Sequence, residues 1–168
     1  MVNKYIFRLV QEYEKQFSLY SDIHQSAHQL QCLCANADFR ETESLNSLNK
    51  LLQFRQVQMQ SIEKSQQIAT YILTGLNSCL EMAGIDGIEL AELLPSPETK
   101  RLKEIIVLLE PILKETVSLD AGSRELLQLK LDSLKDESLK LQKGRDASRA
   151  YKPGREQHAG VFMDGKHC

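Results

Sequence analysis

Apolar side chains recur at alternating intervals of three and four residues along most of this chain. In the first segment they occupy Ile6, Val10, Tyr13, Phe17, Tyr20, Ile23, Ala27 and Leu30. This spacing is typical of one face of an amphipathic helix, because about 3.6 residues make one helical turn. We therefore predict a single long helix over residues 3–35.

A second stripe with the same spacing follows the polar connector NADFRETES. Its positions are apolar at nearly every step: Leu45, Leu48, Leu52, Arg55, Met59, Ile62, Gln66, Ala69, Leu73, Leu76, Leu80 and Ala83. The stripe predicts a second long helix. Asp38 and Glu41 have the spacing of a capping box for its first turn, and Thr42 and Ser44 are alternative N-cap residues.

Two long helices joined by a short polar connector are expected to pack antiparallel, so that each covers the apolar stripe of the other. We therefore predict four buried positions that face the first helix: Leu52, Met59, Ile62 and Leu73. Arg55 and Gln66 interrupt the stripe. Single polar residues in a helical seam commonly fix its register, and contact with a bound peptide is the alternative interpretation.

Glycines and prolines divide the rest of the chain. Gly84 and Gly87 predict the end of the second helix, and the segment IELAELL after them predicts a short helical turn. Pro97 fits the first turn of a third helix, where its missing N–H is not needed. Pro111 predicts a kink in that helix, and Gly122 predicts either a break or a weakened stretch. A last amphipathic stretch contains Leu127, Leu131, Leu134, Leu139 and Leu141.

These patterns predict an all-α protein, an elongated antiparallel helical hairpin or bundle of three to four helices with a flexible C-terminal tail. We expect one domain over residues 1–151 and the tail over residues 152–168, where glycines and a proline occur without periodicity. The composition agrees, because 42% of residues are hydrophobic, only 6% are aromatic and Trp is absent. Unbranched Leu, Gln, Glu and Lys side chains favour helices over strands.

Charge and hydropathy exclude several classes of partner. A formal net charge of −2 gives no overall attraction to nucleic acid or to a membrane surface. The longest apolar run, IIVLL, is far shorter than the roughly 20 residues that a membrane-spanning helix needs. Polar residues interrupt the first segment where a signal peptide would be apolar, so we expect a soluble cytoplasmic protein. The cysteines at positions 32, 34, 79 and 168 lack disulfide-framework spacing, and we expect them to be reduced.

The sequence contains no motif that indicates catalysis or cofactor binding. It lacks a Gly-rich phosphate loop, a nucleophile elbow and a Cys-x-x-Cys pair. His24, His28 and Cys32 lie four residues apart on one helix face, which could hold a soft metal ion. A fourth ligand is not evident nearby, and we interpret these residues as ordinary surface or seam positions. We therefore predict neither an enzyme nor a metal or cofactor site.

Three features together resemble the FlgN-type flagellar export chaperones: the long helical hairpin, the leucine-rich segment LNSLNKLLQFRQVQMQSIEK, and the final helix SRELLQLKLDSLKDESLKLQKGRDASRAY followed by KPG. The resemblance covers about residues 8–160. It implies a cytosolic all-α protein that holds the C-terminal helices of hook-associated proteins before export and delivers them to the cytoplasmic domain of the export gate.

The resemblance and the apolar pattern together give two groups of expected site residues. When a helix binds in an apolar groove, the contacts are made by apolar residues at intervals of three and four. We expect the client on Leu127, Leu131, Leu134 and Leu141. The resemblance implies that Tyr151 docks to the export gate, with Arg145 and Arg149 attracting an acidic surface. The alternative for Tyr151 is that its ring packs on the last turn of the helix and ends it. The alternative is a structural or adaptor bundle, either a single chain or a homodimer, with no role in export.

Overall fold

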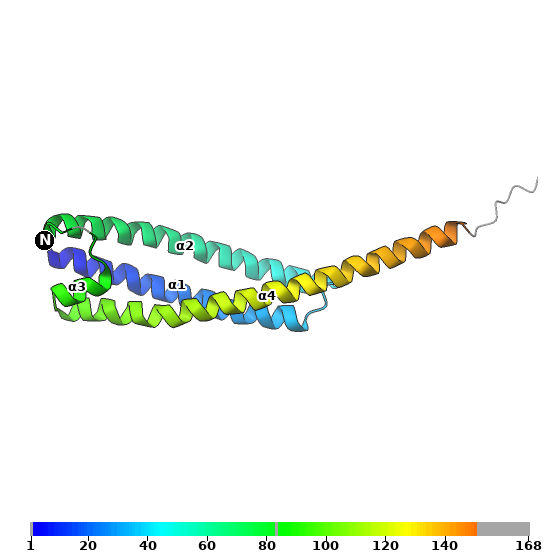
Figure 1. Ribbon diagram of the computed structural model, residues 1–168, viewed down its shortest axis with the longest axis horizontal. Helices are drawn as coiled ribbons and strands as arrows, with labels where there is room; N and C mark the ends of the chain where they lie inside the picture. The colour runs from blue at the N-terminus through cyan, green and yellow to red at the C-terminus, as the bar shows by residue number, and fades with distance from the viewer. Residues whose placement is uncertain (1, 83, 151–168) are drawn as a thin grey trace, which may run out of the picture. The chain divides into compact units, whose positions relative to one another are not determined.

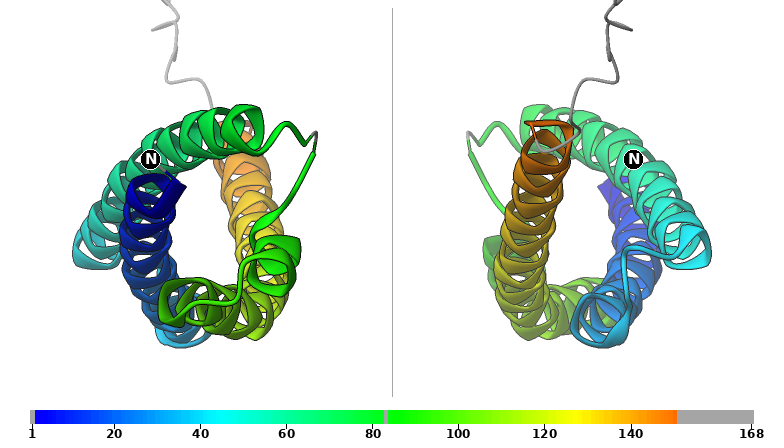
Figure 2. Two further views of the ribbon diagram at one scale, coloured as in Figure 1. Left: turned by 90° about the vertical axis from the view of Figure 1, so that its left-hand side faces the viewer. Right: turned by 90° about the vertical axis from the view of Figure 1, so that its right-hand side faces the viewer.

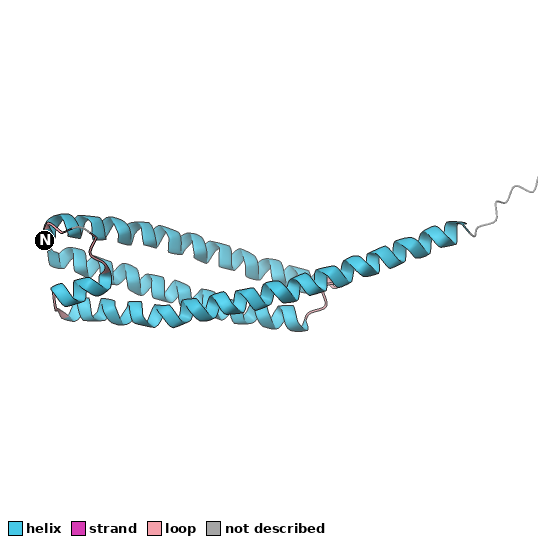
Figure 3. Ribbon diagram, viewed as in Figure 1, coloured by secondary structure: helices cyan, strands magenta, loops and turns pink. Residues whose placement is uncertain are grey.

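The computed structural model describes residues 2–82 and 84–150, and in this part of the chain every regular element is a helix (Figures 1 and 3). The helices are α1 (Val2–Asn36), α2 (Thr42–Leu80), α3 (Gly87–Leu93) and α4 (Pro97–Ala150). The predicted all-α class is therefore confirmed. The predicted tail over residues 152–168 lies outside the described residues.

The chain divides into two compact units, residues 1–128 and residues 129–168. The first unit contains α1, α2, α3 and the first 32 residues of α4, from position 97 to position 128. The described part of the second unit is the remainder of α4, residues 129–150. The boundary that the sequence suggested at residue 151 stays a prediction.

In the first unit, α1 packs against both α2 and the beginning of α4 (Figure 2). One apolar core joins all four elements, and its buried residues are Ile6, Leu9, Val10, Ala69, Ile72, Leu76, Ile85, Leu90, Leu102, Ile105 and Leu109. The antiparallel pairing of α1 and α2 follows from the short connector at residues 37–41. α3 is only seven residues long, so it packs against the core only at one end of the unit.

The predicted buried face of α2 is partly wrong. Ile62 is buried and Leu73 is half-buried, but Leu52 is 44% exposed and Met59 is 60% exposed. The buried side chains of α2 comprise four members of the predicted stripe together with Ser65 and Ile72 beside it; the four are Arg55, Ile62, Ala69 and Leu76. Ser65 is buried there because its hydroxyl donates a hydrogen bond of 2.7 Å to the Glu12 carboxylate on α1. The covered face of α2 is therefore turned away from Leu52 and Met59.

The predicted cap of α2 is also wrong. The N-cap residue is Glu41, and its side chain makes no capping hydrogen bond. The Asp38 carboxylate instead accepts a hydrogen bond from the backbone N–H of Arg40, within the connector. A capping box does occur at α3, where Asp86 and Glu89 bond reciprocally to backbone N–H groups. Short polar side chains in a connector can bond to several nearby backbone N–H groups, so their spacing alone does not identify the cap.

α4 begins at Pro97, as predicted, and continues as one helix through Pro111 and Gly122. Pro111 removes the hydrogen bond to the carbonyl of Val107, four residues earlier. Both side chains are exposed, so water can reach that carbonyl and the helix continues. A Cβ atom at Gly122 would lie 3.3 Å from the Gln31 side chain of α1, so the glycine allows close packing here. The break that we considered at Gly122 does not occur.

Candidate partner-binding surfaces

A stripe of leucines follows one face of α4 in the second unit. Leu131 is 47% exposed, Leu141 is 68% exposed and Leu134 is half-buried. Intervals of three and seven residues place these three side chains on one helix face. We call Leu131, Leu134 and Leu141 the C-terminal leucine stripe. Leu127, the fourth residue expected to bind the client, lies in the first unit and is half-buried.

The second unit gives this stripe no intramolecular partner among its described residues. These residues form only the helical stretch 129–150, so no other element of the unit covers the leucines. Most helices in proteins are stabilised mainly by packing of their apolar face, and the described residues of this unit offer the stretch no such packing. The stretch therefore has the properties of a segment that gains stability when a partner covers it.

The residues expected to dock to the export gate follow the same stretch. Arg145 is exposed and lies four residues after Leu141, so it extends the face that carries the stripe. Arg149 lies within α4, but its side chain is not described. Tyr151 lies outside the described residues. The proposed contact with the gate thus stays a prediction at all three positions.

A second apolar surface lies within the first unit, between α2 and α4. Leu52 and Met59 of α2 face Leu113 and Val117 of α4 across a groove of about 770 Å³. All four side chains are at least 37% exposed. We call this the α2–α4 groove. Its volume is that of a site for a small ligand or for a few large apolar side chains.

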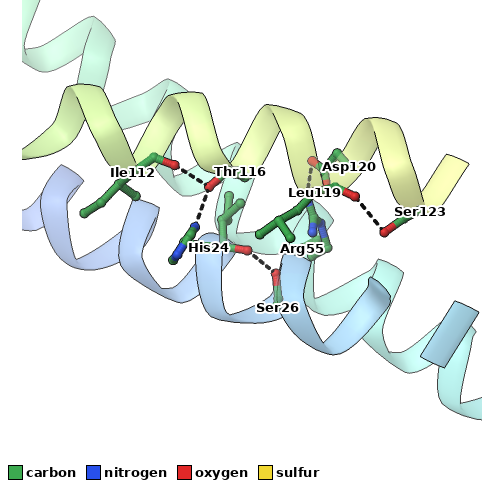
Figure 4. Close-up of polar contacts among 9 residues, drawn as sticks. His24, Ser26, Arg55, Ile112, Thr116, Leu119, Asp120 and Ser123 are labelled. Carbon is green, nitrogen blue, oxygen red and sulfur yellow. Dashed lines mark hydrogen bonds and ion pairs between the residues drawn. The ribbon is translucent and has the colours of Figure 1, made fainter. Parts of the chain in front are cut away.

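Polar groups line part of this groove. Arg55 of α2 forms an ion pair with Asp120 of α4 (Figure 4). Nη1 of Arg55 and Oδ1 of Asp120 are buried without a hydrogen-bond partner among the described residues. Gln66 donates a hydrogen bond of 2.8 Å to the hydroxyl of Tyr20. Burial raises the pKa of Tyr20, and the hydrogen bond from Gln66 opposes this shift.

These contacts favour the structural interpretation of the two polar residues in the α2 stripe. Arg55 joins α2 to α4, and Gln66 joins α2 to α1. Each therefore fixes the register between two helices, which is the commonest use of single polar seam residues. The unpaired atoms of the Arg55–Asp120 pair still leave hydrogen-bonding capacity next to the groove.

One cluster of metal-ligating side chains lies between α1 and α4. His24, His28 and Glu115 have ligand atoms that all lie within 4.8 Å of one another. Nε2 of His24 is 3.6 Å from one Glu115 oxygen, and Nε2 of His28 is 3.7 Å from the other. Cys32, which the sequence suggested as the third member, is not part of this cluster.

Sequence reasoning missed the groove and the third member of the cluster. Leu52 and Met59 were recognised as apolar but were assigned to the core, because periodicity does not show which side of a wide stripe is covered. Leu113 and Val117 lie after Pro111, where the sequence predicted a kink and left the continuity of the helix open. Glu115 is 91 residues from His24 in sequence, and no local pattern connects them.

Comparisons of the chain with protein-family models, with characterised proteins and with solved structures gave no match. Within the described residues, no helix has the length and apolar character needed to cross a membrane. The functional argument therefore depends on the surfaces and contacts described above.

Proposed function

We propose that this protein is a cytoplasmic, non-catalytic export chaperone of the flagellar type III secretion system. Its client is the C-terminal helical region of a hook-associated protein, which packs on the C-terminal leucine stripe. Contact with the cytoplasmic domain of the export gate is made by Tyr151, with Arg145 and Arg149 beside it. The resemblance of the sequence to FlgN-type chaperones supplies the identity of client and gate.

The observation that carries this proposal is the exposure of the leucine stripe on a helical stretch without a covering element in its own described unit. Leu131 and Leu141 are 47% and 68% exposed. Fully burying an exposed leucine side chain contributes about 1.5–3 kcal/mol, so covering the exposed parts of Leu131 and Leu141 favours association with an apolar helix. An amphipathic client helix would pack on the stripe through its own apolar residues, which recur at intervals of three and four.

The stripe can be tested with two variants of the same composition. Leu131→Gln/Leu134→Gln removes the apolar face, whereas Leu129→Gln/Leu139→Gln changes two exposed leucines that point to other sides of the helix. We expect the first variant to lose binding of a purified hook-associated protein and the second to keep it. Both should retain their helical circular dichroism. Equal binding by the two variants would refute the leucine stripe as the client site.

The α2–α4 groove is the other surface that could accept client side chains. Met59→Gln places a polar amide at its exposed edge and leaves the core unchanged. If the client binds only to the leucine stripe, this variant binds as tightly as wild type. A loss of binding here, with binding retained in the Leu131→Gln/Leu134→Gln variant, would move the client site to the groove.

The gate contact requires a separate test. We expect Tyr151→Ala to preserve the fold and client binding but to weaken binding to the cytoplasmic gate domain and to reduce motility. The phenol offers a rigid apolar ring with a polar end, which suits a small docking contact. Tyr71 provides a matched control because it is 78% exposed on α2. Normal motility of the Tyr151→Ala strain at native expression would contradict the role of this residue.

A further inference from the structure

The cluster of His24, His28 and Glu115 brings together two imidazoles and one carboxylate from two helices. The histidines are four residues apart on α1, and their rings make an edge-to-face contact with centroids 4.8 Å apart. Glu115 comes from α4 and places one carboxylate oxygen near each Nε2 atom. Two histidines at this interval on one helix face can bind the same metal ion, as in helical zinc sites.

Hydrogen bonding fixes the orientation of His24. The Thr116 hydroxyl donates its single proton to the carbonyl of Ile112, at 2.7 Å (Figure 4). Its oxygen therefore accepts a hydrogen bond from Nδ1–H of His24, at 3.1 Å. In the neutral ring, Nε2 then carries the lone pair, and that lone pair lies on the side of Glu115.

A neutral His24 ring would bring two hydrogen-bond acceptors close together, its own Nε2 and a Glu115 carboxylate oxygen. A lone pair on Nε2 of His24 and a carboxylate oxygen 3.6 Å away repel each other unless a proton or a metal ion lies between them. Metal-binding histidines commonly form a hydrogen bond through their other ring nitrogen, which holds the ring and its tautomer in place. The Thr116 hydroxyl provides this hydrogen bond for His24. Side-chain exposures of 21%, 50% and 58% for His24, His28 and Glu115 leave the cluster accessible to an ion from solvent.

We propose that His24, His28 and Glu115 form a binding site for a divalent first-row transition metal ion, with zinc as the ion to test. Imidazole nitrogens with one carboxylate favour zinc, nickel, cobalt or copper over magnesium and calcium. The three side chains supply three ligands, and a water molecule completes a tetrahedral site. Because the ligands come from α1 and α4, the bound ion connects these helices within the first unit. The proposal is independent of the export function.

Zinc-dependent stability of the full chain tests the site. The tail residues His158, His167 and Cys168 can also bind zinc, but a ligand stabilises a protein only if it prefers the folded state. We therefore measure the thermal midpoint by circular dichroism in zinc chloride and in chelator. At a zinc concentration about 100 times the dissociation constant, the midpoint of the wild type should rise by about 5–10 °C.

Three variants separate the site from other zinc binding. In His28→Ala and Glu115→Gln the rise should fall below about 2 °C, since each removes one exposed ligand from a site of three. His158→Ala should keep the full rise. Thr116→Val retains all three ligands but loses the partner of His24, and it should bind zinc about 10-fold more weakly by calorimetric titration.

The opposite outcomes overturn the proposal. If zinc leaves the wild-type midpoint unchanged, the three side chains do not form a metal site. If zinc raises the midpoint equally in wild type and Glu115→Gln, the ion binds elsewhere. Circular dichroism of each variant in chelator shows whether it is folded before zinc is added.

Discussion

Ile62 and Met59 lie one helical turn apart on α2, yet the structure gives them opposite environments. Ile62 is 5% exposed and Met59 is 60% exposed. Replacing a buried isoleucine by alanine costs about 2–5 kcal/mol, because it removes apolar contacts and leaves a cavity. Replacing an exposed side chain away from special features usually changes stability by no more than about 0.5 kcal/mol.

For a chain of this length, each kcal/mol shifts the thermal midpoint by about 2–4 °C. Ile62→Ala should therefore lower the midpoint by about 4–20 °C, and Met59→Ala should change it by less than about 2 °C. Alanine has the highest helix propensity, so propensity favours both variants and does not explain the difference. Thermal melts followed by far-UV circular dichroism measure both values. Equal shifts in the two variants would refute the described orientation of α2.

Three further predictions follow from individual contacts. Asp120→Asn should lower the free energy of unfolding by about 1–3 kcal/mol in urea unfolding, because it leaves the buried guanidinium of Arg55 without its counter-ion. This is less than the cost of breaking a fully buried ion pair, because Asp120 is partly exposed and solvent screens its charge. Burial, and secondarily Asp86, raises the pKa of Tyr13 above 10.0. Well below pH 10.0 the phenol is protonated in both states, so Tyr13 should not make the free energy of unfolding depend on pH. Above pH 10.0 the phenol ionises first in the unfolded chain, so the free energy of unfolding should fall. Tyr13→Phe should reduce that fall. Gly122→Ala should raise stability by up to about 1 kcal/mol, because alanine favours a helix and the nearest atom to the new Cβ, at 3.3 Å, is the flexible end of the Gln31 side chain; a lower thermal midpoint would contradict this.

The sequence predicted the long helices well because their apolar periodicity is strong and continuous. α1 was expected over residues 3–35 and covers Val2–Asn36. Pro97 marked the start of α4, since proline is favoured in the first turn of a helix. Local chemistry was enough for these features, because each depends only on neighbouring residues.

Features that depend on distant residues could not be predicted. Which side of α2 is covered is decided by α1 and α4, so Leu52 and Met59 were assigned to the core although they face the groove. The approach of Gly122 to the Gln31 side chain of α1 joins residues that are distant in sequence, so no local pattern indicates it. The ligand set of His24 and His28 depends on Glu115, which tertiary structure alone brings to them. The client and gate residues stay predictions.

The connector between α1 and α2 has a consequence for the order of folding. It contains only residues 37–41, so contacts between the two helices join residues that are close along the chain near the turn. Local contacts form faster than distant ones, because less chain entropy is lost when they close. During synthesis the α1–α2 hairpin is complete at residue 80, before any of α4 has been made. Hydrophobic residues of α1 that later contact α4 are therefore exposed on the nascent chain, and their burial has to wait for translation of residues 97–128.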